Sequence, residues 1–146
     1  MSVFQSIGRV FVLLLSIAFA GGVQAQVELI TADEARLPEA KHAATRAITR
    51  GPQIRLTSSS DVQARSFGLK LSLEARGGSR IDPASLRVEY LKEPPVDISA
   101  RLAPAFKGDV IDIAQATVPA GVHHLRVSVK DSEGRSGSTV ISLHAR

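Results

Sequence analysis

Hydrophobic and polar residues alternate along most of the chain after residue 51. The clearest run is 67–75, where apolar side chains at the odd positions are separated by glycine or polar residues. Strands that bury one face and expose the other to water show this period of two. The pattern predicts seven strands, with Leu71, Val127 and Ile141 buried on facing inner surfaces. The other six runs are 54–57, 86–90, 98–102, 111–113, 125–130 and 139–145.

Turn-forming residues separate these runs. Serine, glycine, proline and aspartate gather between them, and residues 131–134 (Asp-Ser-Glu-Gly) are suited to a short hairpin between the last two strands. Short strands spaced by such turns are typical of an antiparallel sandwich. The predicted fold class is therefore all-β, a seven-strand sandwich over residues 52–146.

The first 25 residues have the pattern of a cleavable secretory signal peptide. Arg9 precedes an apolar run at 10–20, and Val23-Gln24-Ala25 forms an A-x-A-like cleavage site. The apolar run is shorter than the roughly 20 residues of a membrane span, although an uncleaved anchor is the alternative interpretation. The pattern predicts a mature chain that begins at Gln26, has no membrane span after cleavage, and is periplasmic or secreted.

Residues 26–51 differ from the rest and are interpreted as an N-terminal arm. Thr31 and Glu34 have the spacing of a capping box. Pro38 suits the first turn of a second helical piece that runs toward Ile48. Two interpretations remain open: a short helical or flexible arm, or a helix that docks a partner. The apolar stripe of this piece is mostly alanine and is expected to bury little: Leu37, Ala40, Ala44 and Ile48.

Composition disfavours several classes of function. The chain has no cysteine, so disulfides, thiol chemistry and thiolate metal sites are excluded. It carries 18 basic and 14 acidic residues; the first 25 residues hold one basic residue and no acidic one, so the mature net charge is +3. These charges are scattered, which argues against a nucleic-acid partner.

Histidine provides the candidate metal ligands. His123 and His124 are expected to point to opposite faces of a strand, and His124 would share an outer face with His144 if the last two strands pair. Imidazole suits both Cu²⁺ and Zn²⁺. Two ligands are too few for a protein metal site, so the simpler interpretation is a turn histidine and a solvated strand histidine.

Carboxylates and serines give no catalytic pattern. An EF-hand run is absent, and Asp131 is better explained by a bond from its side chain to the turn backbone. No serine lies in a G-x-S-x-G elbow and no phosphate loop follows a strand. No catalytic residue and no cofactor are therefore predicted, and the chain is expected not to be an enzyme.

Two segments resemble a known family. Residues 118–134 (V-P-A-G-V-H-H-L-R-V-S-V-K-D-S-E-G) are similar to the last hairpin of bacterial immunoglobulin-like (Big-type) domains. Residues 81–88 (I-D-P-A-S-L-R-V) resemble the start of a middle strand in the same domains. The resemblance implies an immunoglobulin-like sandwich. This fold carries adhesion, spacer and ligand-binding roles alike, so it does not specify the function.

The expected function is that of a non-enzymatic exported immunoglobulin-like domain. It would bind another protein of the cell envelope or serve as a structural accessory there. The alternative is a small periplasmic module that binds a metal or another ligand through the surface histidines His124 and His144.

Overall fold

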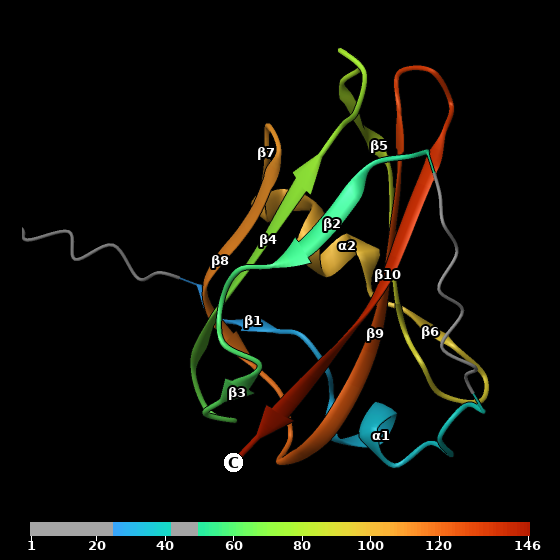
Figure 1. Ribbon diagram of the computed structural model, residues 1–146. Coiled ribbons are helices and arrows are strands. Elements are labelled where there is room, and N and C mark those ends of the chain that lie inside the picture. The colour runs from blue at the N-terminus through green and yellow to red at the C-terminus, as the bar shows by residue number, and fades with distance from the viewer. Residues whose placement is uncertain (1–24, 42–49) are drawn as a thin grey trace, which may run out of the picture.

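Two β-sheets pack face to face in the computed structural model, which describes residues 25–41 and 50–146 (Figure 1). The first sheet has the strand order β1-β8-β4-β2, with β7 also paired to β8; the second has the order β3-β10-β9-β5-β6. Leu71 of the first sheet is completely buried, as is Val127 of the second, and Ile141 is 6 % exposed. The prediction of a mostly β, two-layer fold with these core residues is confirmed.

The strands of the first sheet are β1 (Val27–Glu28), β2 (Gln53–Leu56), β4 (Phe67–Glu74), β7 (Phe106–Lys107) and β8 (Val110–Thr117). Those of the second are β3 (Asp61–Val62), β5 (Ile81–Tyr90), β6 (Val96–Asp97), β9 (Gly121–Asp131) and β10 (Ser136–Ala145). Short helices complete the described part of the chain: α1 (Ala32–Ala35), α2 (Ser99–Leu102) and the 3₁₀ helix η1 (Ala103–Ala105).

The predicted count of seven strands was wrong. Ten strands form in the described residues, because β1, β3, β6 and β7 are two-residue pairings that are too short to produce a visible alternation. The run 98–102 was predicted as a strand but forms α2. Ile98 and Leu102 are both buried and Ala100 is exposed. Residues four apart share one face of a helix as well as one face of a strand, so this short run fits both periods.

The two sheets meet where two chain segments touch backbone to backbone. A Cβ added to Gly137 would lie 1.9 Å from the carbonyl oxygen of Pro52, and a Cβ added to Gly51 would lie 2.1 Å from that of Ser136. Only glycine allows this approach of β10 to the segment that leads into β2. A few residues later the chain changes sheets, since β2 pairs with β4 whereas β3 pairs in parallel with β10.

Residues 26–41, which we call the N-terminal segment, pack on the sandwich. This corrects the interpretation of 26–51 as an arm for the residues described. β1 pairs in parallel with β8, and Leu29 and Ile30 are buried in the core. The capping box at Thr31 and Glu34 is confirmed, but α1 is a single turn. The apolar stripe predicted for this segment did not include Leu29 and Ile30, because these two buried residues come before the helix.

Part of the sequence prediction lies outside the described residues. Pro38 to Lys41 is not helical, and Glu39 instead forms an isolated β-bridge with Lys92. The remainder of the second helical piece falls at 42–49, and nearly all of the predicted signal peptide falls at 1–24; neither stretch is described. No helix in the described residues is long and apolar enough to cross a membrane.

Candidate functional site

Three polar or charged residues are buried in the described part of the chain: Lys92, His123 and Asp131. Burying such groups costs free energy unless hydrogen bonds or opposite charges compensate. The partners of each group therefore indicate whether it serves the fold or is available for chemistry.

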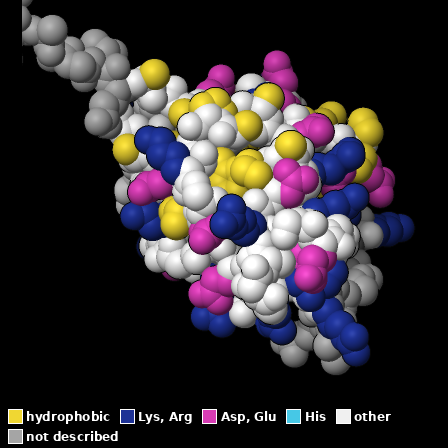
Figure 2. All heavy atoms as spheres, turned by 90° about the horizontal axis from the view of Figure 1, so that it is seen from above, with side chains coloured by type: hydrophobic (Ala, Val, Ile, Leu, Met, Phe, Trp, Pro, Cys, Tyr) yellow, Lys and Arg dark blue, Asp and Glu magenta, His cyan; other side chains and the backbone are white. Residues whose placement is uncertain are grey.

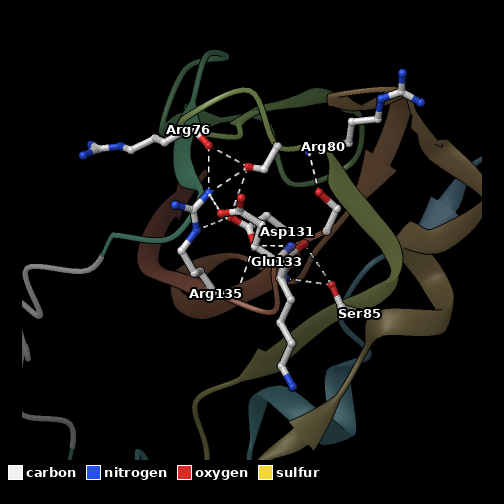
Figure 3. Close-up of polar contacts among 9 residues, drawn as sticks. Arg76, Arg80, Ser85, Asp131, Glu133 and Arg135 are labelled. Carbon is white, nitrogen blue, oxygen red and sulfur yellow. Dashed lines mark hydrogen bonds and ion pairs between the residues drawn. The ribbon is translucent and has the colours of Figure 1, made fainter.

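Asp131 lies at the end of β9, at the centre of the contacts drawn in Figure 3. Its Oδ1 accepts hydrogen bonds from the backbone N–H groups of Glu133 (3.0 Å) and Arg135 (2.9 Å). Its Oδ2 accepts one from Arg135 Nε at 2.8 Å and one from Ser79 Oγ at 3.2 Å. The prediction that this side chain bonds the turn backbone is confirmed.

These contacts tie the β9–β10 hairpin to the turn that connects β4 of the first sheet with β5 of the second. Besides binding Asp131, the Arg135 guanidinium donates through Nη2 to the carbonyl oxygen of Arg76 (2.8 Å), in the turn between β4 and β5. Burial by itself raises the pKa of Asp131, but the bonds from Arg135, Glu133 and Ser79 outweigh it and hold this pKa below its usual range. The carboxylate is thus charged, fully engaged and structural. No group of three or more metal-ligating side chains occurs in the described residues.

Lys92 and His123 belong to a chain of polar contacts at the other end of β5. Lys92 Nζ contacts Glu39 Oε1, donates to the carbonyl oxygen of Ala35 (3.1 Å) and lies 5.2 Å from the centre of the Tyr90 ring. Burial lowers the pKa of Lys92, but Glu39 and Tyr90 outweigh this and raise it above the usual value. The charged Lys92 side chain therefore joins the N-terminal segment to the chain that directly follows β5.

His123 continues this chain of contacts. Its Nε2 lies 2.7 Å from the carbonyl oxygen of Pro119, and its Nδ1 lies 2.8 Å from the hydroxyl of Tyr90. A carbonyl oxygen only accepts hydrogen bonds, so Nε2 carries a proton and donates it to Pro119. Both ring nitrogens are occupied, which leaves neither for a metal.

A second tie fixes the N-terminal segment to α2. Arg101 donates to both carboxylate oxygens of Glu34, at 2.6 Å and 2.8 Å, and to the carbonyl oxygen of Leu29 at 2.9 Å. The Arg101 guanidinium is the main reason that the pKa of Glu34 falls from 4.5 to about 2. Sequence analysis assigned Glu34 to the capping box but gave no signal for its partner 67 residues away.

The two surface histidines lie as predicted on one face of the second sheet. In the register of β9 and β10, His124 is opposite Ser142 and His144 is opposite Val122, so the histidines are diagonal neighbours. His124 Nδ1 lies 2.8 Å from the hydroxyl of Ser142. His123 points inward, which confirms the expected opposite orientation of the adjacent histidines.

We call the outward side chains of β5, β9 and β10 the outer face. It holds several charged and polar side chains that take no part in the contacts described above. Arg87, Arg126 and Lys130 supply three cations, and Glu89 is shared by the two arginines at 3.1 Å and 3.8 Å. The two large hydrophobic side chains exposed in the described residues, Val122 and Val140, also belong to this face. A hollow of about 300 Å³ lies on it, lined by Ser85, Arg87, Ser128, Val129, Lys130 and Ser136.

Two other surface regions have less defined chemistry. The end of the molecule at the top of Figure 1 shows basic and acidic side chains interspersed around a small hydrophobic area (Figure 2). A shallow depression of about 450 Å³ lies between the N-terminal segment and residues 117–120, with Glu28 and Arg65 as its charged lining residues. The depression thus has one charged residue of each sign rather than a group of cations.

Comparison with family models, with curated proteins and with solved structures finds no match to this chain.

Proposed function

We propose that this chain is a non-enzymatic immunoglobulin-like domain that acts outside the cytoplasm, in the periplasm or after secretion. Its role is to bind another protein of the cell envelope or to serve as a structural accessory there. The observation that carries the proposal is the order of the long strands: β2, β4 and β8 in one sheet, and β5, β9 and β10 in the other.

That order supports the immunoglobulin-like part of the proposal. An immunoglobulin-type sandwich places its first, second and fifth strands in one sheet and its third, sixth and seventh in the other. When β2, β4, β5, β8, β9 and β10 are taken as strands one, two, three, five, six and seven, the pairings are the same. The chain between β5 and β8 runs through β6, α2, η1 and β7, and only the two-residue β7 pairs with β8, where the fourth strand of that order would lie.

The partners of the buried polar and charged side chains support a binding role rather than a catalytic one. Lys92, His123 and Asp131 are engaged with the turns and with the N-terminal segment. A residue that holds the fold in this way is not available to accept a substrate proton. The outer face, with its mixture of arginines, hydroxyls and two exposed valines, has the composition of a polar protein interface.

Site-specific photo-crosslinking in an exporting host tests the proposal. A photoreactive amino acid at Val140, on the outer face, should give crosslinks to one envelope protein. The same probe at Arg55, exposed on the first sheet, is the matched control and should give none. Equal labelling from both positions, or no protein adduct from either, would contradict a binding role for this face.

The second candidate function is metal binding by His124 and His144, which the shared outer face favours. Calorimetric titration of the mature chain with Zn²⁺ separates protein binding from metal binding as the function. On the main proposal, binding should be weak and unchanged in His144→Ala, because two imidazoles make an incomplete site. Stoichiometric, tight binding that His144→Ala abolishes would instead favour the metal module.

A further inference from the structure

The hollow on the outer face results from an irregularity in β5. Asp82 pairs with Lys130 and Arg87 pairs with Ser128, so four residues of β5 bulge opposite the single residue Val129. The hydroxyl of Ser85 pins this bulge to β9, since it accepts the backbone N–H of Lys130 at 2.7 Å. The regular backbone pairing of β5 with β9 is therefore interrupted between positions 128 and 130.

The groups that line the hollow are hydrogen-bond donors. Arg87 lies opposite Ser128, and Ser128 lies opposite Ser138 with 3.2 Å between their hydroxyl oxygens. In the next row Lys130 lies opposite Ser136. Hydroxyls beside an arginine and a lysine are the donors with which proteins bind oxyanions.

Acidic side chains nearby do not neutralise the site. The Glu89 carboxylate contacts Arg87 Nε through one oxygen and Arg126 Nη1 through the other. Asp82, across from Lys130, turns its carboxylate to the N–H of Ala84 in its own bulge (3.1 Å). Lys130 has no ion-pair partner within the described residues. Three cations (Arg87, Arg126 and Lys130) against two acids (Glu89 and Asp82) leave the outer face with a small positive excess, and both charged residues that line the hollow are cations.

We infer that this hollow receives a carboxylate side chain from an acidic segment of the partner protein, an inference that rests on the proposed function. Arg87 and Lys130 supply the positive charge, and Ser128 and Ser136 supply hydroxyl donors. The exposed Val140, next to Ser138 along β10, offers apolar contact beside the charged group. An acidic protein segment fits this mixture better than a lipid surface, because the face carries no aromatic residue to enter a bilayer interface.

Nuclear magnetic resonance titration of the mature chain, Gln26 to Arg146, tests the inference. A hexaglutamate peptide should shift the backbone amides at 85–87, 128–130 and 136–138, and the effect should weaken with added salt. A hexaglutamine peptide of the same length is the uncharged control and should leave these amides in place.

Paired variants identify the cations. Arg87→Gln combined with Lys130→Gln should weaken hexaglutamate binding by at least about tenfold, because both opposite charges are lost. Lys70→Gln removes an exposed cation from the first sheet and is the matched control, with unchanged affinity expected. Thermal unfolding of each variant verifies that it is folded.

Other outcomes would overturn the inference. Equal shifts with hexaglutamate and hexaglutamine would remove the role of charge. Binding of inorganic phosphate or of phosphatidylglycerol vesicles without binding of hexaglutamate would make the ligand a phosphate group or a lipid surface. Crosslinking from Val140 with no hexaglutamate binding would leave the proposed function supported and this inference wrong. Hexaglutamate binding without any crosslink would support the carboxylate site and overturn the proposed protein partner.

Discussion

Glu34 is the residue whose ionisation has the clearest consequence for stability. The Arg101 guanidinium binds both of its carboxylate oxygens and lowers its pKa from 4.5 to about 2. A carboxyl group with a depressed pKa in the folded state stabilises the fold above its unfolded-state pKa. That contribution is lost as the pH falls from about 4.5 toward about 2.

Glu34→Gln should therefore lower the free energy of unfolding near neutral pH, by about 1.5–3 kcal/mol for a hydrogen-bonded charge. Urea unfolding at a series of pH values measures the difference from the wild type. The difference should shrink between about pH 4.5 and pH 2, as wild-type Glu34 becomes protonated. Asp33→Asn, at an exposed neighbouring position, is the control and should have a small effect. A constant difference across this range would contradict the assigned role.

The backbone contact between β10 and the segment before β2 determines how these two elements pack. Gly137→Ala should destabilise the fold by at least about 1–3 kcal/mol, because the new methyl group would overlap the carbonyl oxygen of Pro52. Gly68→Ala is the matched control in β4, where a Cβ would meet its nearest atoms at 3.8 Å. Chemical denaturation of both variants measures the contrast, and equal midpoints would show that the contact relaxes without cost.

The N-terminal segment is the element whose role changed most from the sequence prediction. Leu29→Ala should lower the free energy of unfolding by about 2–5 kcal/mol, because its side chain is completely buried in the core. Glu28→Ala, at an exposed position in β1, should change it little. Denaturation of the two variants distinguishes a structural segment from a dispensable arm. A melting temperature unaffected by Leu29→Ala would restore the arm interpretation.

At the scale of the whole molecule, the site at which the signal peptide is cleaved tests the proposed export. Mature protein from an exporting host should begin at Gln26, because Val23 and Ala25 supply the small residues that signal peptidase recognises. N-terminal sequencing of the periplasmic or secreted fraction measures this directly. Retention of Met1 in a membrane fraction would support the uncleaved anchor instead. Gln26 lies just before β1, so the predicted cut leaves the segment that packs on β8 intact.

The whole fold also explains why no disulfide is needed. The core runs from Leu29 in the N-terminal segment to Ala145 in the last strand, so nearly the full described length contributes side chains to it. Ion pairs lie at both ends of this core: Asp131 with Arg135 at the β9–β10 hairpin, and Lys92 with Glu39 and Arg101 with Glu34 at the other end. Packing and these ties together take the place that cross-links hold in many small exported domains.

The sequence by itself determined the strands that are long enough to alternate. In β4, β9 and β10 each inward position is specified by its own residue type, so Leu71, Val127 and Ile141 were identified without any knowledge of their neighbours. The capping box at Thr31 and the turn bond of Asp131 were predictable for the same reason, since each involves residues within four positions of one another.

Only the tertiary structure decided which distant residues meet. Nothing in the local pattern indicates that Arg101 binds Glu34, that Lys92 reaches Glu39, or that Gly137 touches Pro52. The two-residue strands and the α2 turn were missed because they arise from pairing and burial against other elements rather than from periodicity. The hollow on the outer face has the same origin: its serines and cations come from β5, β9 and β10, and only the register across the bulge brings them together.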